Sequence, residues 1–451
     1  MAEVPSKSVS RAQFGSPGLA IGLLVLYAAL LMLPLVIAGM AGTRGPEAFA
    51  RVAAKNFALV ATTILFMQAV LAARIKQICR HYGLDMVLRF HKAMAVLAVT
   101  LLIAHPVLLS LGSGSWRLLT SLDMPWPIWF GRTALVLLLI QGITSLWQRQ
   151  LLDFQVWRKL HNIAPVILVL GFVHSWIVGD DLESPMMRVL WVVLMGASVT
   201  AYTLHKFVWP MTRKSKLWTV VSVKPETHSV WTLEFEPPEG VEPLQHAPGQ
   251  FNFLTLYRGD ERYDGEEHHF TISSSPLQGQ THTSTIKSSG DFTSTIGATK
   301  PGDQVAIQGP YGSFSYVLDR PSSKYLFIAG GIGITPLMAM LRHMRDTAAD
   351  VDVTLIHANN TQDDIVFRDE LDEMVDGDAP RLKVVHVLDK EEWEGVTGHV
   401  TRTLIADVAS EDLADYEIYV CGPPVMMEKI YRMVLRMGAR EARLHSERFW
   451  L

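Results

Sequence analysis

Four histidines lie in or beside long apolar segments, where an ionisable ring is costly and marks a candidate functional site. His91 and His105 are 14 residues apart in one segment, and His161 and His174 are 13 residues apart in another. On helices these spacings give rises of about 21 Å and about 19.5 Å. If the two helices run in the same direction, His91 matches His161 in depth and His105 matches His174. Each pair can then supply two axial imidazoles to one haem iron.

Other interpretations of these histidines remain open. For a single histidine, the ordinary explanation is a buried ring bonded to a backbone carbonyl. A zinc site needs ligands that converge within a few ångströms, which a 14-residue rise forbids on one helix. Fourteen residues return to within about 40° of the same helix face, but thirteen miss it by about 140°. Pro165 lies between His161 and His174, so the helix is expected to kink or unwind there, or else the two haems face different edges.

Six apolar segments must position these histidines. Apolar residues make up 49% of the 451 residues and charged residues 19%, whereas soluble domains average about 25% charged. About 20 helical residues cross a bilayer. The segments that we predict to be membrane helices are residues 19–41, 57–73, 93–111, 133–147, 160–179 and 189–204. Lysine and arginine are enriched before the first helix, in alternate loops and after the sixth, which predicts that both termini are cytoplasmic.

Charge and cysteine content exclude several classes of protein. The net charge of −4 argues against a globally basic nucleic-acid-binding protein, so no nucleic-acid partner is expected. The two cysteines, Cys79 and Cys421, cannot build a disulfide framework or a cysteine-rich metal site. The expected surroundings are membrane lipid, and the oligomeric state is left open.

From about residue 217 the pattern changes to short alternating segments separated by Pro and Gly, which predicts an antiparallel β-domain. After Pro321, apolar strands alternate with helical patterns, as in a doubly wound parallel sheet. The predicted fold class is therefore a six-helix membrane bundle followed by an antiparallel β-barrel and an α/β doubly wound domain. The predicted domains are residues 1–210, 211–320 and 321–451.

Three cytoplasmic motifs carry candidate binding residues. Residues 268–273 read His-His-Phe-Thr-Ile-Ser, and residues 286–293 read Ile-Lys-Ser-Ser-Gly-Asp-Phe-Thr. Residues 330–336, Gly-Gly-Ile-Gly-Ile-Thr-Pro, follow a predicted strand and open a predicted helix. Glycine lets the backbone approach a pyrophosphate, and a helix N-terminus stabilises its charge. Each motif alone is also compatible with ordinary turn chemistry.

The histidine spacing, together with these motifs, resembles the ferric reductase / NADPH oxidase transmembrane family over nearly the whole chain. In that family the four histidines ligate two b-type haems. The cytoplasmic half resembles ferredoxin–NADP reductases, with His269 standing where the membrane family has Pro. The resemblance implies that Phe270 and Thr271 lie on the isoalloxazine of FAD and that His268 faces its phosphates.

The same resemblance assigns the remaining site residues. It implies that the second motif binds the FAD pyrophosphate and that the glycine turn binds NADH or NADPH. Cys421 would flank the nicotinamide and shape hydride transfer. A near-terminal aromatic, Phe449 or alternatively Trp450, would shield the flavin. The full cofactor-binding set is His268, Phe270, Thr271, Ile272, Ser273, Ile286, Lys287, Gly290, Phe292, Thr293, Gly330, Gly331, Gly333, Thr335, Pro336, Cys421, Gly422 and Pro423.

The expected function is electron transfer from cytoplasmic NAD(P)H through FAD and two haems b to an acceptor across a bacterial inner membrane. Oxygen, giving superoxide, and ferric iron are the candidate acceptors. Leu109 occupies a position where oxidase relatives carry another histidine, which argues against oxygen, and Arg51 or Lys55 are candidates for an outer basic group. The absence of Arg among residues 359–361 favours NADH. The alternative function is a redox-sensing or electron-donor cytochrome subunit that serves a partner protein or quinone.

Overall fold

The computed structural model describes residues 17–40, 49–259 and 265–447. Chain contacts separate a helical unit that ends at Pro210 from a second unit that begins at Met211. Each unit is described by itself below.

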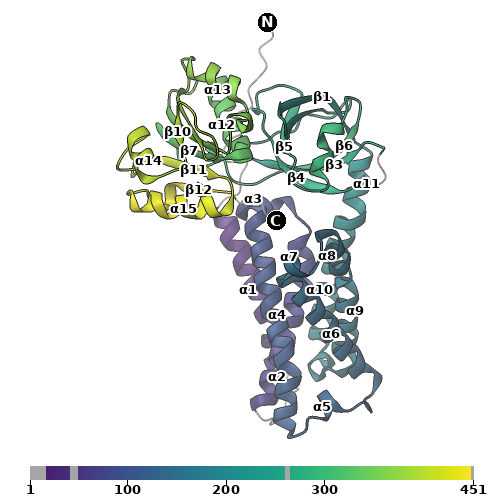
Figure 1. The fold of residues 1–451 in the computed structure, drawn as a ribbon. Coiled ribbons are helices and arrows are strands. Elements are labelled where there is room, and N and C mark those ends of the chain that lie inside the picture. Colours follow the sequence, from purple (N-terminus) through teal and green to yellow (C-terminus); the bar gives the residue numbers. More distant parts are fainter. Residues whose placement is uncertain (1–16, 41–48, 260–264, 448–451) are drawn as a thin grey trace. The chain divides into compact units, whose positions relative to one another are not determined.

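Within the described residues, six helical spans are long and apolar enough to cross a membrane, as predicted. Helices from these spans lie side by side in one bundle (Figure 1). The spans are α1 (Pro17–Met40), α2 (Phe49–Ala72), α4 (Leu84–Ser113), α6 (Trp126–Leu146), α8 (Phe154–His161) with α9 (Ala164–Val178), and α10 (Pro185–Thr203) with its extension. Several helices begin before the predicted apolar runs. α2 starts eight residues earlier, so Arg51 and Lys55 are helical.

The fifth span is interrupted between its two histidines. α8 ends at His161, residues 162–163 form a turn, and α9 begins at Ala164 with Pro165 in its first turn. Proline is accepted there because its missing N–H has no partner in the first turn of a helix. His161 and His174 therefore do not share one continuous helix, and the 140° mismatch calculated for an unbroken helix does not apply.

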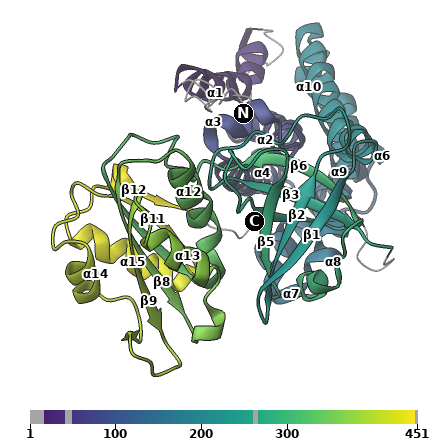
Figure 2. The ribbon, with the colours of Figure 1, turned by 90° about the horizontal axis from the view of Figure 1, so that it is seen from above.

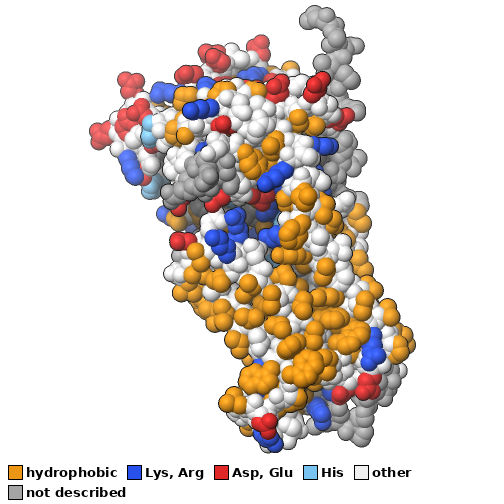
Figure 3. Space-filling model, turned by 90° about the vertical axis from the view of Figure 1, so that its right-hand side faces the viewer, with side chains coloured by type: hydrophobic (Ala, Val, Ile, Leu, Met, Phe, Trp, Pro, Cys, Tyr) orange, Lys and Arg blue, Asp and Glu red, His pale blue; other side chains and the backbone are white. Residues whose placement is uncertain are grey.

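The surface of the helical unit suits a lipid solvent. Large apolar side chains are exposed on several helices, for example Ile21, Val25, Val136 and Val189. The face shown in Figure 3 is covered mostly by hydrophobic side chains. Soluble monomeric proteins rarely expose apolar patches of this size to water. The chain is therefore an integral membrane protein.

The first part of the second unit is an antiparallel sheet with strand order β4-β3-β6-β1-β2-β5. Its strands are β1 (Trp218–Thr227), β2 (Val230–Glu236), β3 (Phe251–Tyr257), β4 (Glu267–Thr271), β5 (His282–Lys287) and β6 (Gln304–Tyr311). An isolated bridge pairs Ile272 with Ser284, and the Ser273 N–H donates to the Thr283 carbonyl at 2.8 Å. These contacts join the two edge strands, so the sheet closes as the predicted barrel.

The second sheet is parallel throughout, in the order β10-β9-β8-β7-β11-β12. Its strands are β7 (Lys324–Gly330), β8 (Asp352–Asn359), β9 (Arg381–Leu388), β10 (Val396–Thr397), β11 (Glu417–Cys421) and β12 (Leu444–Ser446). α12 (Ile334–Asp346) and α13 (Arg368–Val375) cover one face, while α14 (Arg402–Val408) and α15 (Pro424–Arg436) cover the other (Figure 2). This is the predicted doubly wound α/β domain.

Candidate functional site

His91 and His161, the pair predicted to lie nearer the cytoplasm and called the inner pair below, lie together in the helical unit. The ring centres of His91 and His161 are 6.3 Å apart, with 63° between the ring planes. Metal–imidazole bonds of about 2 Å on either side of one metal place two ring centres about 6 Å apart. Trp157 stacks on the other side of His161 at 5.1 Å. The spacing of this pair fits two axial imidazoles.

Gln141 on α6 contacts the other nitrogen of His161. Its Nε2 lies 3.0 Å from His161 Nδ1, while Gln141 Oε1 is buried and has no hydrogen-bond partner among the described residues. Amide oxygen and nitrogen are assigned from their surroundings, and exchanging them lets Nδ1–H donate to Oε1. That arrangement satisfies Gln141 and leaves a lone pair on His161 Nε2 for a metal.

His105 and His174, the pair predicted to lie nearer the far side of the membrane and called the outer pair below, each bond a backbone carbonyl. His105 Nδ1 lies 2.9 Å from the Ala54 oxygen, and His174 Nδ1 lies 2.7 Å from the Pro127 oxygen. A carbonyl only accepts, so each Nδ1 carries the proton and each Nε2 keeps its lone pair. Metal-ligating histidines normally hold this tautomer through such a second contact.

His105 and His174 line one cavity of about 390 Å³. Most of its lining is apolar, including Leu109. Its polar lining includes Arg51, Lys55, Arg132 and Asp180. Lys55 forms an ion pair of 2.8 Å with Asp180. The donor chemistry and the apolar walls fit a haem with two axial imidazoles, although ligation by the four histidines stays a prediction.

The two predicted flavin motifs meet in an aromatic stack in the second unit. His268 lies on Phe292 with ring centres 3.9 Å apart and planes 14° apart, and Phe270 is stacked 6.4 Å from both rings. Arg258 lies 5.6 Å over the Phe292 ring. Residues separated by more than 20 positions are thus brought to one place that presents aromatic faces and a cation.

The segment predicted to bind the FAD pyrophosphate contains converging amides. The N–H groups of Ser289 and Gly290 both donate to Thr293 Oγ1, at 2.9 Å and 2.8 Å. Both amides are satisfied by the hydroxyl of the same segment, which orders the turn in which they lie. Ile286 is different, because it pairs with β2 and its side chain is buried in the barrel core, and Lys287 ends the same strand. Any contact of Ile286 with a cofactor is therefore limited to its backbone.

Thr271, Ile272 and Ser273 are buried at the end of β4. The Ser273 hydroxyl lies 2.9 Å from the Thr283 hydroxyl, and its carbonyl accepts a 2.6 Å hydrogen bond from Arg342 of α12. Arg342 also binds Glu370 through two nitrogens. The strand predicted to carry the flavin is thereby tied to the nucleotide-binding domain.

The glycine turn and the Cys-Gly-Pro segment lie side by side at the carboxyl ends of β7 and β11. A Cβ placed on Gly330 would lie 2.5 Å from Met426 Sδ and 2.7 Å from Pro423 Cδ, and one on Gly422 would lie 3.0 Å from Gly330 Cα. Gly331 has φ +52°, a conformation that favours glycine. Carboxyl ends of parallel strands are where such sheets bind nucleotides.

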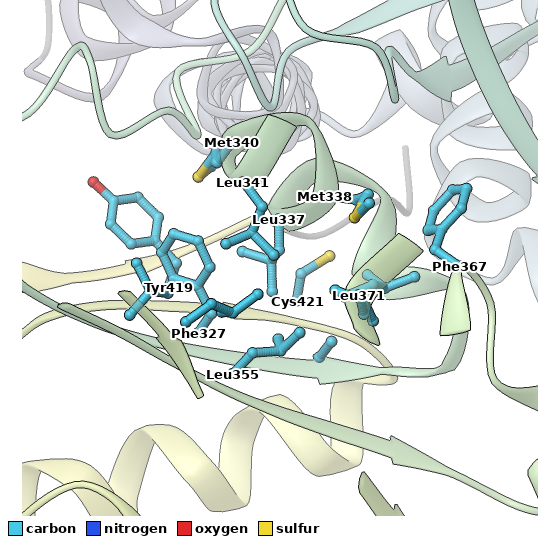
Figure 4. Packing of buried hydrophobic residues seen from close by; sticks show 14 of the residues in the cluster. Phe327, Leu337, Met338, Met340, Leu341, Leu355, Phe367, Leu371, Tyr419 and Cys421 are labelled. Carbon is cyan, nitrogen blue, oxygen red and sulfur yellow. The ribbon is translucent and has the colours of Figure 1, made fainter. Parts of the chain in front are cut away.

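Three other predicted residues are buried. Thr335 and Pro336 lie in the first turn of α12, where the Thr335 hydroxyl donates to the Ile332 carbonyl at 3.0 Å. Cys421 lies among the core side chains of Figure 4 between Leu337 and Leu355. Burial, with the nearby charge of Glu447, raises the pKa of the Cys421 thiol well above its usual value. Cys421 is therefore a neutral thiol. Phe449 and Trp450 lie outside the described residues.

His357 of β8 is a residue that the motif search missed. It is fully buried, and its Nε2 lies 3.2 Å from the Gly331 carbonyl, so it can hold the glycine turn in place. Burial, then the charge of His386, lowers the pKa of His357 to about 3, which keeps the ring neutral. A histidine within the apolar strand that follows the helix after the glycine turn was the available sequence signal.

Comparison with known families matches both halves of the chain. Residues 57–172 match the model described as ferric reductase like transmembrane component, and residues 327–432 match the oxidoreductase NAD-binding domain. A glycine betaine monooxygenase reductase subunit of Pseudomonas aeruginosa is 33% identical over 214 residues, covering 45% of this chain and 56% of that protein. An NADH-cytochrome b5 reductase 1 of Candida glabrata is 34% identical over 158 residues, covering 34% and 55%.

Among solved structures, the flavohem-like FAD/NAD binding domain of nitric oxide dioxygenase from Vibrio cholerae is 22% identical, with a TM-score of 0.46. It covers 51% of this chain and 97% of that one. The chain spans only a little over half of the length of the two relatives named above.

Proposed function

The chain contains a ferric reductase-like transmembrane domain and an NAD-binding oxidoreductase domain, and from this combination we propose that it transfers electrons from NADH or NADPH across a membrane. The FAD and nucleotide sites would lie in the second unit, and the acceptor on the opposite side. We place both termini in the cytoplasm, because basic residues are concentrated in the predicted inner loops, and we propose a bacterial inner membrane as the location. The enzyme class is an NAD(P)H-dependent flavocytochrome oxidoreductase.

The observation that carries this proposal is the geometry of the four histidines. His91 faces His161, and His105 and His174 share one cavity, so the axial ligands come in two pairs along the bundle. When bound, FAD supplies the conversion from electron pairs to single electrons, and haem iron supplies a one-electron relay. The protein holds His105 and His174 in the tautomer that leaves Nε2 free to ligate, and apolar walls exclude water from their cavity.

The second unit contributes binding and orientation. Gly330 and Gly422 let the two segments pack against each other, and a Cβ added to Gly331 would meet no atom within 4 Å, so the backbone of the glycine turn is open to a dinucleotide there. The half-buried rings of His268 and Phe270 would contact the flavin nucleotide, with Phe292 packed beneath His268 in the barrel core. The Ser289 and Gly290 amides, which donate to Thr293 Oγ1 in this structure, would have to exchange that oxygen for one of a phosphate. Arg342 keeps the two domains of this unit in contact.

Oxygen or ferric iron is the acceptor that we propose at the outer cavity. The lining holds Arg51, Lys55 and Arg132 against Asp180 and Asp181, with Lys55 paired to Asp180. The small positive excess favours an anionic ferric chelate or an oxygen species that gains negative charge. Leu109 supplies an apolar wall where an oxidase would use a histidine. Assays for superoxide and for ferrous iron on the same purified protein distinguish the two acceptors.

Anaerobic addition of NADH or NADPH to the detergent-solubilised full chain tests the proposed function. We expect bleaching of flavin absorbance followed by the Soret shift of reduced haem. Flavin bleaching without any haem band would mean a membrane-anchored flavin reductase. A haem protein whose flavin and haem do not respond to either nucleotide would instead be a sensor or an electron-donor subunit.

A further inference from the structure

The adenosine end of the proposed nucleotide site can be located at the carboxyl edge of β8 and β9. The Asp389 N–H donates to the Asn359 carbonyl at 3.1 Å, and the Lys390 N–H donates to the Asn360 carbonyl at 3.0 Å. These bonds join the segments that follow the two strands. Gly330 of β7 pairs with Ala358 of β8, so the joined segments lie beside the glycine turn. A dinucleotide lying across these strand ends would reach them with its adenosine ribose.

A carboxylate is fixed at this edge. Glu391 accepts the backbone N–H of Gln362 at 2.7 Å and the side-chain Nε2–H of Gln362 at 3.1 Å. Among the described residues, no lysine or arginine forms an ion pair with Glu391. Arg368 and Lys390 are the bases near this edge: Arg368 donates to Gln362 Oε1 at 3.4 Å, and Lys390 directly precedes Glu391. Gln362 thus holds Glu391 in position, and no ion pair within the described residues neutralises its carboxylate.

A second observation points to a ligand at the same edge. Asn359 is 7% exposed, and neither its Oδ1 nor its Nδ2 has a hydrogen-bond partner among the described residues. A buried amide without partners costs free energy, and native proteins rarely keep one without a role. Asn359 ends β8 and Glu391 follows β9, so an amide and a carboxylate flank the predicted ribose position. Both side chains bind hydroxyl groups well.

We propose that Asn359 and Glu391 form the adenosine-ribose subsite and that Glu391 selects a dinucleotide with a free 2′-hydroxyl, which is NADH. A 2′-hydroxyl donates a hydrogen bond to the carboxylate. A 2′-phosphate can only accept at neutral pH, and its negative charge is repelled by the carboxylate at short range. This inference rests on the proposed function, because it concerns the nucleotide that reduces the flavin.

Flavin reduction kinetics test the inference without involving the haems. The full chain in detergent is mixed anaerobically with NADH or NADPH, and kcat/KM for flavin bleaching is measured for each. We expect kcat/KM of the native protein to be at least about tenfold higher for NADH than for NADPH. Glu391→Gln should lower that ratio about tenfold, because KM for NADPH should fall. Glu394→Gln is the matched control, because it removes the same charge from an exposed side chain three residues away. Its preference should stay within about twofold of the native value.

Competition by nucleotide fragments gives a second readout that does not need turnover. Adenosine 5′-monophosphate and adenosine 2′,5′-bisphosphate are compared as inhibitors of flavin reduction by NADH. The 5′-monophosphate should have the lower inhibition constant with the native protein. In Glu391→Gln the inhibition constants of the two fragments should be closer together. Equal or better inhibition by the 2′-phosphorylated fragment, or a preference for NADPH unchanged by Glu391→Gln, would overturn the assignment. Failure of both dinucleotides to reduce the flavin would contradict the proposed function instead.

Discussion

His174 packs directly against Gly131, so closely that a Cβ added to Gly131 would lie 2.7 Å from Cε1 of the imidazole ring. The glycine on α6 therefore makes room for the ring that donates to the Pro127 carbonyl. The two contacts together determine which nitrogen of His174 faces the outer cavity. A change at Gly131 should affect that histidine before it affects the fold.

We predict that Gly131→Ala displaces His174 and weakens retention of the outer haem. Changes to the groups that orient a metal ligand typically cost about 10–100-fold in affinity. The measurement is haem content per flavin, together with the low-temperature spectrum of the reduced protein. Gly142→Ala on the same helix is the control, because its added Cβ would be 3.8 Å from Val99, an ordinary contact. Full haem content in Gly131→Ala would show that the tight contact with His174 is not needed.

The glycine turn gives a second prediction. A Cβ at Gly330 meets the rigid Pro423 ring, so Gly330→Ala should push apart the two segments proposed to bind the nucleotide. We expect kcat/KM for NADH-driven flavin reduction to fall about tenfold to hundredfold. Flavin content and reduction by dithionite should be retained. Gly377→Ala, whose Cβ would meet its nearest atom at 3.4 Å, is the control in the same domain.

Arg342 should contribute measurably to the stability of the second unit. It binds the Ser273 carbonyl and both carboxylate oxygens of Glu370 while largely buried. Burial alone would raise the pKa of Glu370, but hydrogen bonds and charge from Arg342 and Arg345 hold it below its usual value. Arg342→Met should lower the free energy of unfolding by about 1–3 kcal/mol, measured by denaturant titration with release of flavin fluorescence. An unchanged midpoint of unfolding would show that the hydrogen bonds of Arg342 to Ser273 and Glu370 do not stabilise the second unit.

The barrel should also lose stability in mild acid because of His282. This ring is fully buried, and its Nε2 lies 3.1 Å from the side-chain amide of Asn252. Burial, then the charge of His246, lowers the pKa of His282 to about 3. Below pH 6.5 the unfolded chain binds a proton that the folded chain does not, so stability falls as pH drops from 6.5 towards 3.

The slope due to His282 approaches about 1.4 kcal/mol per pH unit. His282→Gln should flatten the dependence of the unfolding midpoint on pH between 6.5 and 4.5. His399→Gln changes an exposed histidine in the same unit and should leave the slope as it was. Parallel pH profiles for the native protein and His282→Gln would contradict the assignment.

The sequence was sufficient for the fold class because the two halves differ in hydrophobic periodicity. Long apolar runs predict membrane helices, and alternation interrupted by glycine and proline predicts strands. Helix ends were predicted less well, because charged residues such as Arg51 and Lys55 lie on α2 without interrupting it. The short strands β10 and β12 were missed, since two or three residues carry almost no periodic signal.

The contacts of the candidate site depended on tertiary structure. The 13-residue spacing between His161 and His174 was compatible with a broken helix or with haems that face different edges. In the structure the helix is broken at residues 162–163. Neither Gln141 beside His161 nor Gly131 beside His174 follows from sequence spacing, because each pair belongs to different helices. The same is true of His357 and the glycine turn.

The central claim is that two histidine pairs hold two haems between a flavin and an outer acceptor. The most direct measurement is haem stoichiometry in the purified native protein and in His161→Leu, combined with anaerobic reduction by NADH. The account predicts two haems per flavin in the native protein. It predicts one in His161→Leu, with normal flavin bleaching and no electron transfer to the acceptor. A His161→Leu protein that keeps both haems and the full electron flux would contradict it.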